Sequence, residues 1–156
     1  MAYRDWTYHG LQFGPEKQRN QPDEAWEPGR IWVEEPEFGP TERQDVTVLR
    51  ELESGPYGDF AWGYNGNGTS RAAAAILADA LELGDPVKAG ISVDDGLEDD
   101  VLIRLREAFC DEVLSQDCAE WRLRRVVVLR WARSWYGQAA ITALPDGLQL
   151  PALDDD

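Results

Sequence analysis

The sequence predicts an α+β fold, in which a small antiparallel sheet of about three to four strands packs against about three helices. Two observations support this class. Short runs of alternating apolar and polar residues occupy the first third of the chain, and later segments repeat apolar residues at three- and four-residue intervals. At 156 residues, the chain has the length of one domain and can bury its own core.

Four segments are expected to form strands. Residues 3–14 alternate aromatic and polar side chains and end at a glycine, and residues 31–35 and 45–52 are predicted to be two short strands, of which the second alternates clearly. A fourth strand is expected at residues 59–64, after a Gly-Pro turn. The polar, proline-containing segment 15–29 is expected to be a loop.

Two helices are indicated clearly. The alanine-rich segment after 67–70 predicts a helix that ends near Leu83, because alanine is the strongest helix former and Gly84, Asp85 and Pro86 follow. Apolar residues at helical spacing predict a second helix over about 97–115, with carboxylates in its first turn. The segment 87–96 between these helices is expected to be a loop or a brief extended piece.

Residues 120–137 can be interpreted in two ways. Val126–Leu129 resembles a buried strand, whereas Val128, Trp131 and Trp135 lie at helical spacing, which favours a helix from about 124 to 135. We therefore expect one α+β domain over residues 1–137. A loosely ordered acidic tail is expected over 138–156.

The charge is the most unusual property of the chain. Thirty acidic and fifteen basic residues give a net charge of −15, which repels nucleic-acid phosphates and disfavours direct DNA or RNA binding. Adaptation to high salt or a need for solubility would also explain this acidity. No apolar stretch is long enough to span a membrane and no signal-peptide core is visible, so a cytoplasmic location is expected.

The sequence predicts no catalytic residue, no metal site and no cofactor. His9, Cys110 and Cys118 are too few and too widely spaced for a zinc site, and the cysteines are expected to be reduced thiols. No serine or cysteine nucleophile with a recognisable motif accompanies His9. We therefore expect a protein that is not an enzyme.

A glycine-rich turn links the expected strand at 59–64 to the alanine-rich helix. Such a turn can present free N–H groups to an anion, but its G-x-x-G-x-G spacing differs from that of phosphate-binding loops and no lysine is near. A tight turn capped by Asn67, Thr69 or Ser70 is therefore favoured. The residues of the alternative ligand site are Trp62, Gly63, Tyr64, Gly66, Asn67, Gly68, Thr69 and Ser70.

Trp62 and Tyr64 are two residues apart and would share one face of a strand. Such a pair can stack on a ligand. Burial in the core is favoured, because large aromatic side chains dominate small cores.

Clustered carboxylates are the strongest functional feature. They can occupy a basic groove that normally holds nucleic acid, while their charge steers association. The expected partner interface consists of Glu34, Glu35, Glu37, Asp94, Asp95, Glu98, Asp99 and Asp100, and a third acidic group is Asp154–Asp156.

The glycine–aromatic motif also carries a family resemblance. The pattern F-x-W-G-Y-x-G-x-G, followed by an alanine-rich helix, is similar to the domain-of-unknown-function family numbered 6166. Thr69 replaces the usual proline, and Arg124 and Arg125 replace a capping threonine and an acid. The matching positions are Phe60, Trp62, Gly63, Tyr64, Gly66, Gly68, Phe109, Trp121, Leu123 and Trp131.

The resemblance implies no established activity, and it favours an accessory or anti-defence role of the kind encoded by phages and mobile elements. The leading hypothesis is a non-enzymatic acidic protein that engages a basic, nucleic-acid-binding protein partner, as a nucleic-acid mimic or inhibitor. The alternative is an anion- or nucleotide-binding module that uses the glycine-rich turn. An unrecognised hydrolase is a third possibility, which an acidic pocket with converging polar groups would support.

Overall fold

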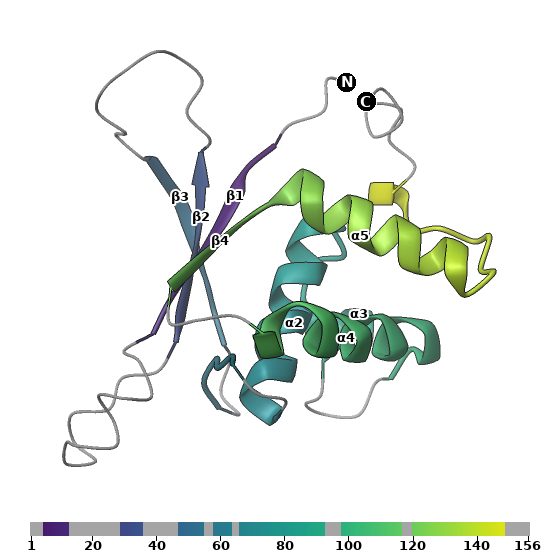
Figure 1. Ribbon diagram of the computed structural model, residues 1–156, viewed down its shortest axis with the longest axis horizontal. Coiled ribbons are helices and arrows are strands. Elements are labelled where there is room, and N and C mark those ends of the chain that lie inside the picture. The colour runs from purple at the N-terminus through teal and green to yellow at the C-terminus, as the bar shows by residue number, and fades with distance from the viewer. Residues whose placement is uncertain are drawn as a thin grey trace.

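The computed structural model describes residues 5–12, 29–35, 47–54, 58–63, 66–92, 98–116 and 120–148. Four strands form one antiparallel sheet in the order β3-β2-β1-β4. Helices gather on one side of this sheet (Figure 1), which confirms the α+β class. The strands are β1 (Thr7–Leu11), β2 (Arg30–Glu35), β3 (Thr47–Leu52) and β4 (Glu120–Arg124). The helices are α2 (Asn67–Ala80), α3 (Pro86–Ala89), α4 (Asp100–Glu112) and α5 (Arg125–Gln138), with short 3-10 turns η2 (Leu114–Gln116) and η3 (Asp146–Leu148).

The central strand β1 determines how the sheet meets the helices. Tyr8 pairs with Val33 on one side and with Leu123 on the other, and Tyr8 and Val33 are fully buried on the helix-facing side. Gly10 lies under the indole of Trp121, where an added Cβ would come within 2.3 Å of the ring. Glycine is therefore required at this position so that the indole can lie flat against the strand.

Helix α2 forms the centre of the core. Its residues from Ala72 to Ala78 are all buried, and it packs against α3, α4, α5 and η2. A helix that is apolar on every side belongs in the interior, and alanine side chains allow its neighbours to approach closely. The predicted alanine-rich helix is confirmed, although α2 ends at Ala80 rather than near Leu83.

The expected strand at 59–64 is wrong. Phe60 forms only an isolated bridge with Gly29. The backbone N–H of Ala61 instead donates to the Gly68 carbonyl at 3.1 Å, and that of Gly63 to the Leu114 carbonyl at 2.9 Å. Because these N–H groups donate to carbonyls of α2 and η2, they are not available for hydrogen bonds to a neighbouring strand.

The fourth strand is β4, which lies within the ambiguous segment 120–137. Trp121 and Leu123 point toward the helices while alternate residues are exposed, so a period of two precedes the helical period of α5. The favoured helix over about 124–135 is confirmed by α5.

One connecting segment also differs from expectation. The segment 87–96 contains the short helix α3, because Pro86 occupies its first turn and Gly90 ends it with a φ of 88°. Helix α4 lies inside the predicted range 97–115. Residues 15–28 of the loop predicted at 15–29 lie outside the described residues.

The described part of the expected tail packs on the domain. Leu148 is fully buried, and an added Cβ at Gly147 would meet the Leu81 carbonyl oxygen at 2.8 Å. Residues 139–148 therefore belong to the packed structure, while 149–156 lie outside the described residues.

Candidate functional site

The glycine-rich turn is a structural junction. Gly63 has a φ of 86°, a left-handed conformation that favours glycine. Gly68 lies so close to Ala61 that an added Cβ would be 2.8 Å from the Ala61 side chain. Trp62 is buried, as the core interpretation predicted, and its ring packs edge-on against Trp121 with 5.2 Å between centroids. Tyr64 lies outside the described residues.

The predicted side-chain caps of this turn are wrong. The N-cap of α2 is Gly66, and no side chain caps the helix. Thr69 and Ser70 lie inside the first turn and are buried, where the Ser70 hydroxyl oxygen accepts a weak hydrogen bond from the Cys110 thiol at 3.9 Å. Because both side chains face the interior, neither is available to a ligand at the helix start.

The described residues of the predicted acidic interface do not form one surface. Glu34 is buried and bound by His9, so it is not part of an exposed patch. Asp99 caps α4 by accepting hydrogen bonds from the N–H groups of Val101 and Leu102, both at 3.0 Å. The C-terminal end of β2 and the N-terminal end of α4 lie on opposite sides of the molecule (Figure 1). Glu35, Glu98 and Asp100 are exposed, whereas Glu37, Asp94 and Asp95 lie outside the described residues.

A histidine between two carboxylates lies on the sheet face away from the helices. The His9 ring contacts Glu34 through Nδ1 at 2.7 Å and Glu120 through Nε2 at 2.6 Å. Arg122 lies 3.6 Å from the second oxygen of Glu34. The hydrogen bond from His9 lowers the pKa of Glu120. Since both ring nitrogens are engaged, His9 joins β1, β2 and β4 rather than offering a base to a substrate.

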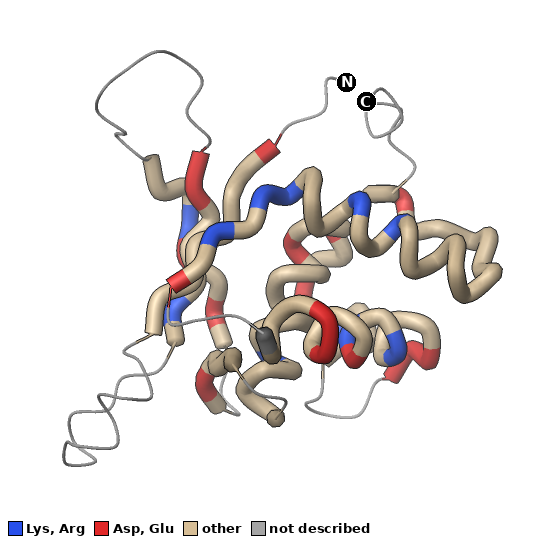
Figure 2. The backbone as a smooth tube through the Cα atoms, in the orientation of Figure 1, with Lys and Arg blue, Asp and Glu red and all other residues tan. Residues whose placement is uncertain are grey.

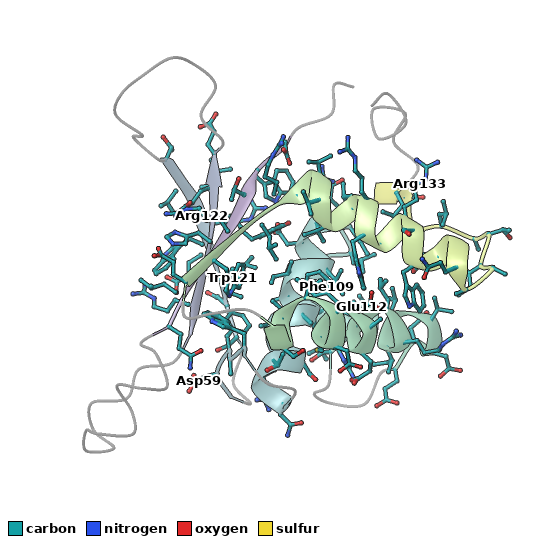
Figure 3. The ribbon with its side chains drawn as sticks, viewed as in Figure 1. Asp59, Phe109, Glu112, Trp121, Arg122 and Arg133 are labelled. Carbon is teal, nitrogen blue, oxygen red and sulfur yellow. The ribbon has the colours of Figure 1, made fainter. Side chains whose placement is uncertain are left out.

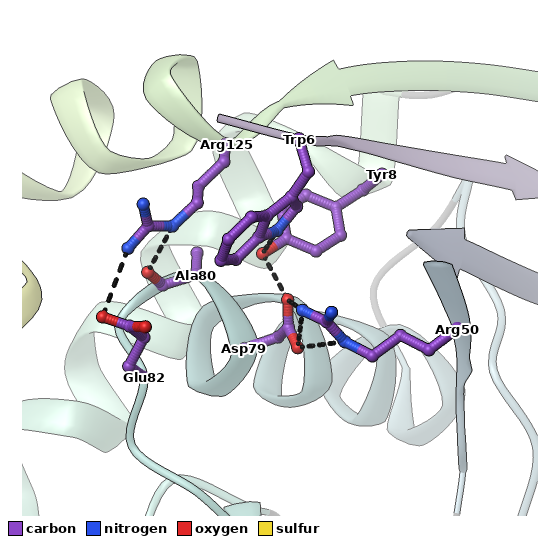
Figure 4. Close-up of polar contacts among 7 residues, drawn as sticks. All are labelled: Trp6, Tyr8, Arg50, Asp79, Ala80, Glu82 and Arg125. Carbon is purple, nitrogen blue, oxygen red and sulfur yellow. Dashed lines mark hydrogen bonds and ion pairs between the residues drawn. The ribbon is translucent and has the colours of Figure 1, made fainter. Parts of the chain in front are cut away.

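A second polar network joins the sheet to α2 (Figure 4). The Trp6 indole N–H donates to the Tyr8 hydroxyl oxygen at 2.7 Å, and the Tyr8 hydroxyl donates to Asp79 at 2.7 Å. Arg50 on β3 donates to both oxygens of the same carboxylate, at 2.8 and 2.9 Å through Nη2. Burial raises the pKa of Tyr8 far above its ordinary value, and the Asp79 charge adds to this effect, so the hydroxyl remains a donor.

Arg125 completes the network from the start of α5. Its guanidinium lies 4.4 Å from the Trp6 ring centroid and donates through Nε to the Ala80 carbonyl at 3.0 Å. The Asp5 carboxylate accepts a hydrogen bond from the Val126 N–H at 3.0 Å. Asp5 therefore caps α5 from a distant part of the sequence, in place of the local capping residue that Arg124 and Arg125 do not provide.

Two hollows lie beside β3, and they share Glu51, Leu52 and Glu53. The larger has a volume of about 600 Å³ and is lined by Gly29, Arg30, Glu51, Leu52, Glu53, Ser54, Asp59 and Phe60. The smaller has a volume of about 380 Å³ and is lined by Arg50, Glu51, Leu52, Glu53, Ala75, Ala78, Asp79, Gly84, Asp85 and Pro86.

The arginines around these hollows are engaged by carboxylates. Arg30 donates to both oxygens of Glu51, at 2.9 and 2.7 Å, and this pairing lowers the pKa of Glu51. Arg50 is held by Asp79 in the same way. The remaining acids of the two hollows are Glu53, Asp59 and Asp85, which are exposed and whose carboxylates make no hydrogen bond or ion pair within the described structure.

Over the rest of the described chain, too, the arginines are engaged while several carboxylates are not. Every described arginine makes a polar, ring or electrostatic interaction, and Lys88 is the described basic residue without one. Figure 2 shows acidic positions at strand ends and along α4. The exposed carboxylates without a partner among the described residues are Glu35, Glu53, Asp59, Asp85, Glu98, Asp100, Glu112 and Asp146.

The remaining chemistry-bearing groups do not form a site. Burial raises the pKa of the Cys110 thiol to about 11, and Cys118 lies outside the described residues. In the described part of the chain, no group of three or more His, Cys, Asp or Glu side chains could hold a metal ion. None of the described helices has the length and apolar character that crossing a membrane requires.

Comparison with known protein families found a match over part of the chain. Residues 26–89 match the model of the Family of unknown function (DUF6166), so the expected resemblance is confirmed over this region. The match includes β2, β3, the glycine-rich turn and α2. No curated protein and no solved structure matched the chain.

Proposed function

We propose that this protein is a non-enzymatic binding protein whose acidic surface engages a protein partner with a basic, nucleic-acid-binding surface. The observation that carries this proposal is the distribution of charge partners. The described arginines interact within the molecule, whereas exposed carboxylates remain without partners on the sheet and the helices. The net charge of −15 adds long-range attraction toward a basic surface.

Such a protein would compete with nucleic acid for the same basic groove. An inhibitory role, as an accessory protein of a phage or mobile element, is one form of this proposal. Its free carboxylates would replace phosphates, and the binding energy would come from contacts that salt weakens.

The anion-binding alternative has weaker support. Thr69 and Ser70 are buried, and Trp62 packs against Trp121 instead of facing an open stacking site. The two acidic hollows are the feature that would support the hydrolase hypothesis. Arg30, however, lowers the pKa of Glu51 instead of raising it. A general acid at neutral pH needs the opposite shift.

The test begins with cross-linking of the tagged protein in its source cells, followed by reconstitution with the purified partner. We expect the partner to bind nucleic acid and the acidic protein to displace that nucleic acid. Affinity should fall steeply between about 0.1 M and about 1 M NaCl, where the screening length falls from about 10 Å to about 3 Å. A partner without a basic surface, or an affinity that salt leaves unchanged, would contradict the proposal.

A further inference from the structure

Strand β3 is an outer strand of the described sheet, and its residues other than Leu49 and Leu52 are exposed. Among the described strands only β2 pairs with it, and Val48 retains 53% of its surface. In an antiparallel sheet, alternate residues of an edge strand direct their N–H and C=O groups outward, where another strand can pair with them. The register irregularity opposite Val33 and Glu34 lies in the first half of β3, so residues 50–52 pair regularly with β2.

The regular half of β3 is also the part that both hollows adjoin. Glu51 and Glu53 line both of them, with Asp59 on the larger and Asp85 on the smaller. Glu51 is neutralised by Arg30, which leaves Glu53, Asp59 and Asp85 without partners among the described residues. An incoming strand would therefore meet an outward backbone edge that lies next to carboxylates without partners among the described residues.

We propose that β3 binds an extended basic segment of a partner protein as an added strand. Backbone hydrogen bonds to the β3 edge would hold the segment, and arginine or lysine side chains at alternate positions would reach the carboxylates of the two hollows. This inference rests on the proposed function and identifies the binding surface. A second copy of this chain is disfavoured as the occupant, because it also carries a charge of −15.

The experiment uses a fluorescent peptide of about eight residues in which arginine alternates with threonine. Two further peptides carry N-methyl groups on either the odd or the even backbone amides. Strand addition uses amides on one edge of the peptide, so we expect one methylated peptide to bind like the parent and the other to lose at least about tenfold in affinity. Equal binding of both methylated peptides would show that only charge is recognised.

Two charge-reversal variants test the location. Glu53→Lys with Asp59→Lys changes the larger hollow, and Glu98→Lys with Glu112→Lys changes the same number of exposed carboxylates near the two ends of α4. Figure 3 shows Asp59 beside the sheet and Glu112 on the helical side. We expect at least about tenfold weaker peptide binding in the first variant and about threefold or less in the second. Circular dichroism and thermal melting confirm that both variants fold.

The outcomes separate the two proposals. Equal losses in the two variants would overturn the β3 site while leaving salt-dependent binding of a basic partner intact. A natural partner that lacks a basic surface would overturn the proposed function and the β3 site together. Hydrogen exchange provides a direct readout, because added peptide should protect outward β3 amides. Protection that grows with protein concentration without peptide would overturn the proposal in favour of self-association.

Discussion

The two outer strands of the sheet differ in whether their charged side chains have partners within the domain. On β4, Arg124 donates to Asp5 at 3.0 and 2.6 Å, and Arg122 lies near Glu34 and Glu120. The chain then enters α5 directly, and the Arg125 N–H donates to the Trp6 carbonyl at 2.7 Å. On β3, the acids of the adjoining hollows include several that have no partner within the described structure.

This contrast indicates which strand is available to a partner. The charges of β4 are balanced by other parts of the same domain, and its end is anchored by Asp5. β3 is tied to the helices through Arg50 and Asp79 and through the packing of its leucines against the core, and Glu53, Asp59 and Asp85 beside it have no side-chain partner among the described residues. Under the proposed function, a basic strand would bind at the β3 edge and not at the β4 edge.

The largest expected effect comes from releasing β3 from α2. Asp79→Ala removes the acceptor of the buried Tyr8 hydroxyl and the partner of Arg50, so we expect a loss of about 2–4 kcal/mol in the free energy of unfolding. Chemical denaturation measures this loss. Amide exchange should accelerate more in β3 than in β4.

Asp79→Asn is the matched control. The amide keeps the shape and one acceptor oxygen, so it should lose roughly half as much stability as the alanine variant. Equal acceleration of exchange in both outer strands would show that Asp79 supports the whole core and not β3 in particular.

The next largest loss of stability is expected at β4. Gly10→Ala places a methyl group where the Trp121 ring lies, at 2.3 Å, and the buried indole has little room to move. We expect a loss of about 1–3 kcal/mol, measured by denaturation, with faster amide exchange in β1 and β4. Gly137→Ala is the control, because no atom lies within 4 Å of its added Cβ in α5. It should be neutral or stabilising.

A smaller effect is expected where Asp5 anchors β4 and α5. Asp5→Ala removes the acceptor of the Val126 N–H and the partner of Arg124, which should cost about 1–2 kcal/mol in thermal or chemical unfolding. Asp5→Asn keeps an oxygen for the N–H and should retain most of the capping contribution. If the asparagine variant loses as much as the alanine variant, then the Arg124 ion pair and not the cap stabilises this junction.

Local patterns predict much of this fold, because the information lies within each segment. The alanine run of α2, the spacing of α4 and the strand patterns of β2 and β3 need no distant partner to be recognised. Local sequence does not determine whether residues 59–64 or residues 120–124 form the fourth strand. Both segments place a tryptophan at an alternating position, and the outcome depends on Trp121 fitting over Gly10, which lies more than a hundred residues earlier.

The candidate site also has features that local sequence predicts and features that depend on distant partners. The net charge predicts an acidic surface, and Asp99 before a helix could have been recognised as an N-cap. Which acids stay available depends on partners far away in the sequence. Glu34 is removed from the surface by His9, whereas Glu53 was not selected because it belongs to no dense acidic cluster.

The smallest expected effect is a pH dependence at the β4 edge. The hydrogen bond from His9 lowers the pKa of Glu120 in the folded protein, below the value of about 4.5 expected in the unfolded chain. Stability from this pair is therefore present above pH 4.5 and is lost as the pH falls through the lowered folded pKa. Glu120→Gln should flatten the rise of stability with pH in this acidic range, as measured by denaturant unfolding at each pH.

Glu112→Gln, at an exposed carboxylate without a partner among the described residues, should leave the slope unchanged. Equal slopes in the wild-type and Glu120→Gln proteins would show that His9 does not stabilise the charged form of Glu120, and that the β4 edge relies on Asp5 and the Trp121 packing instead.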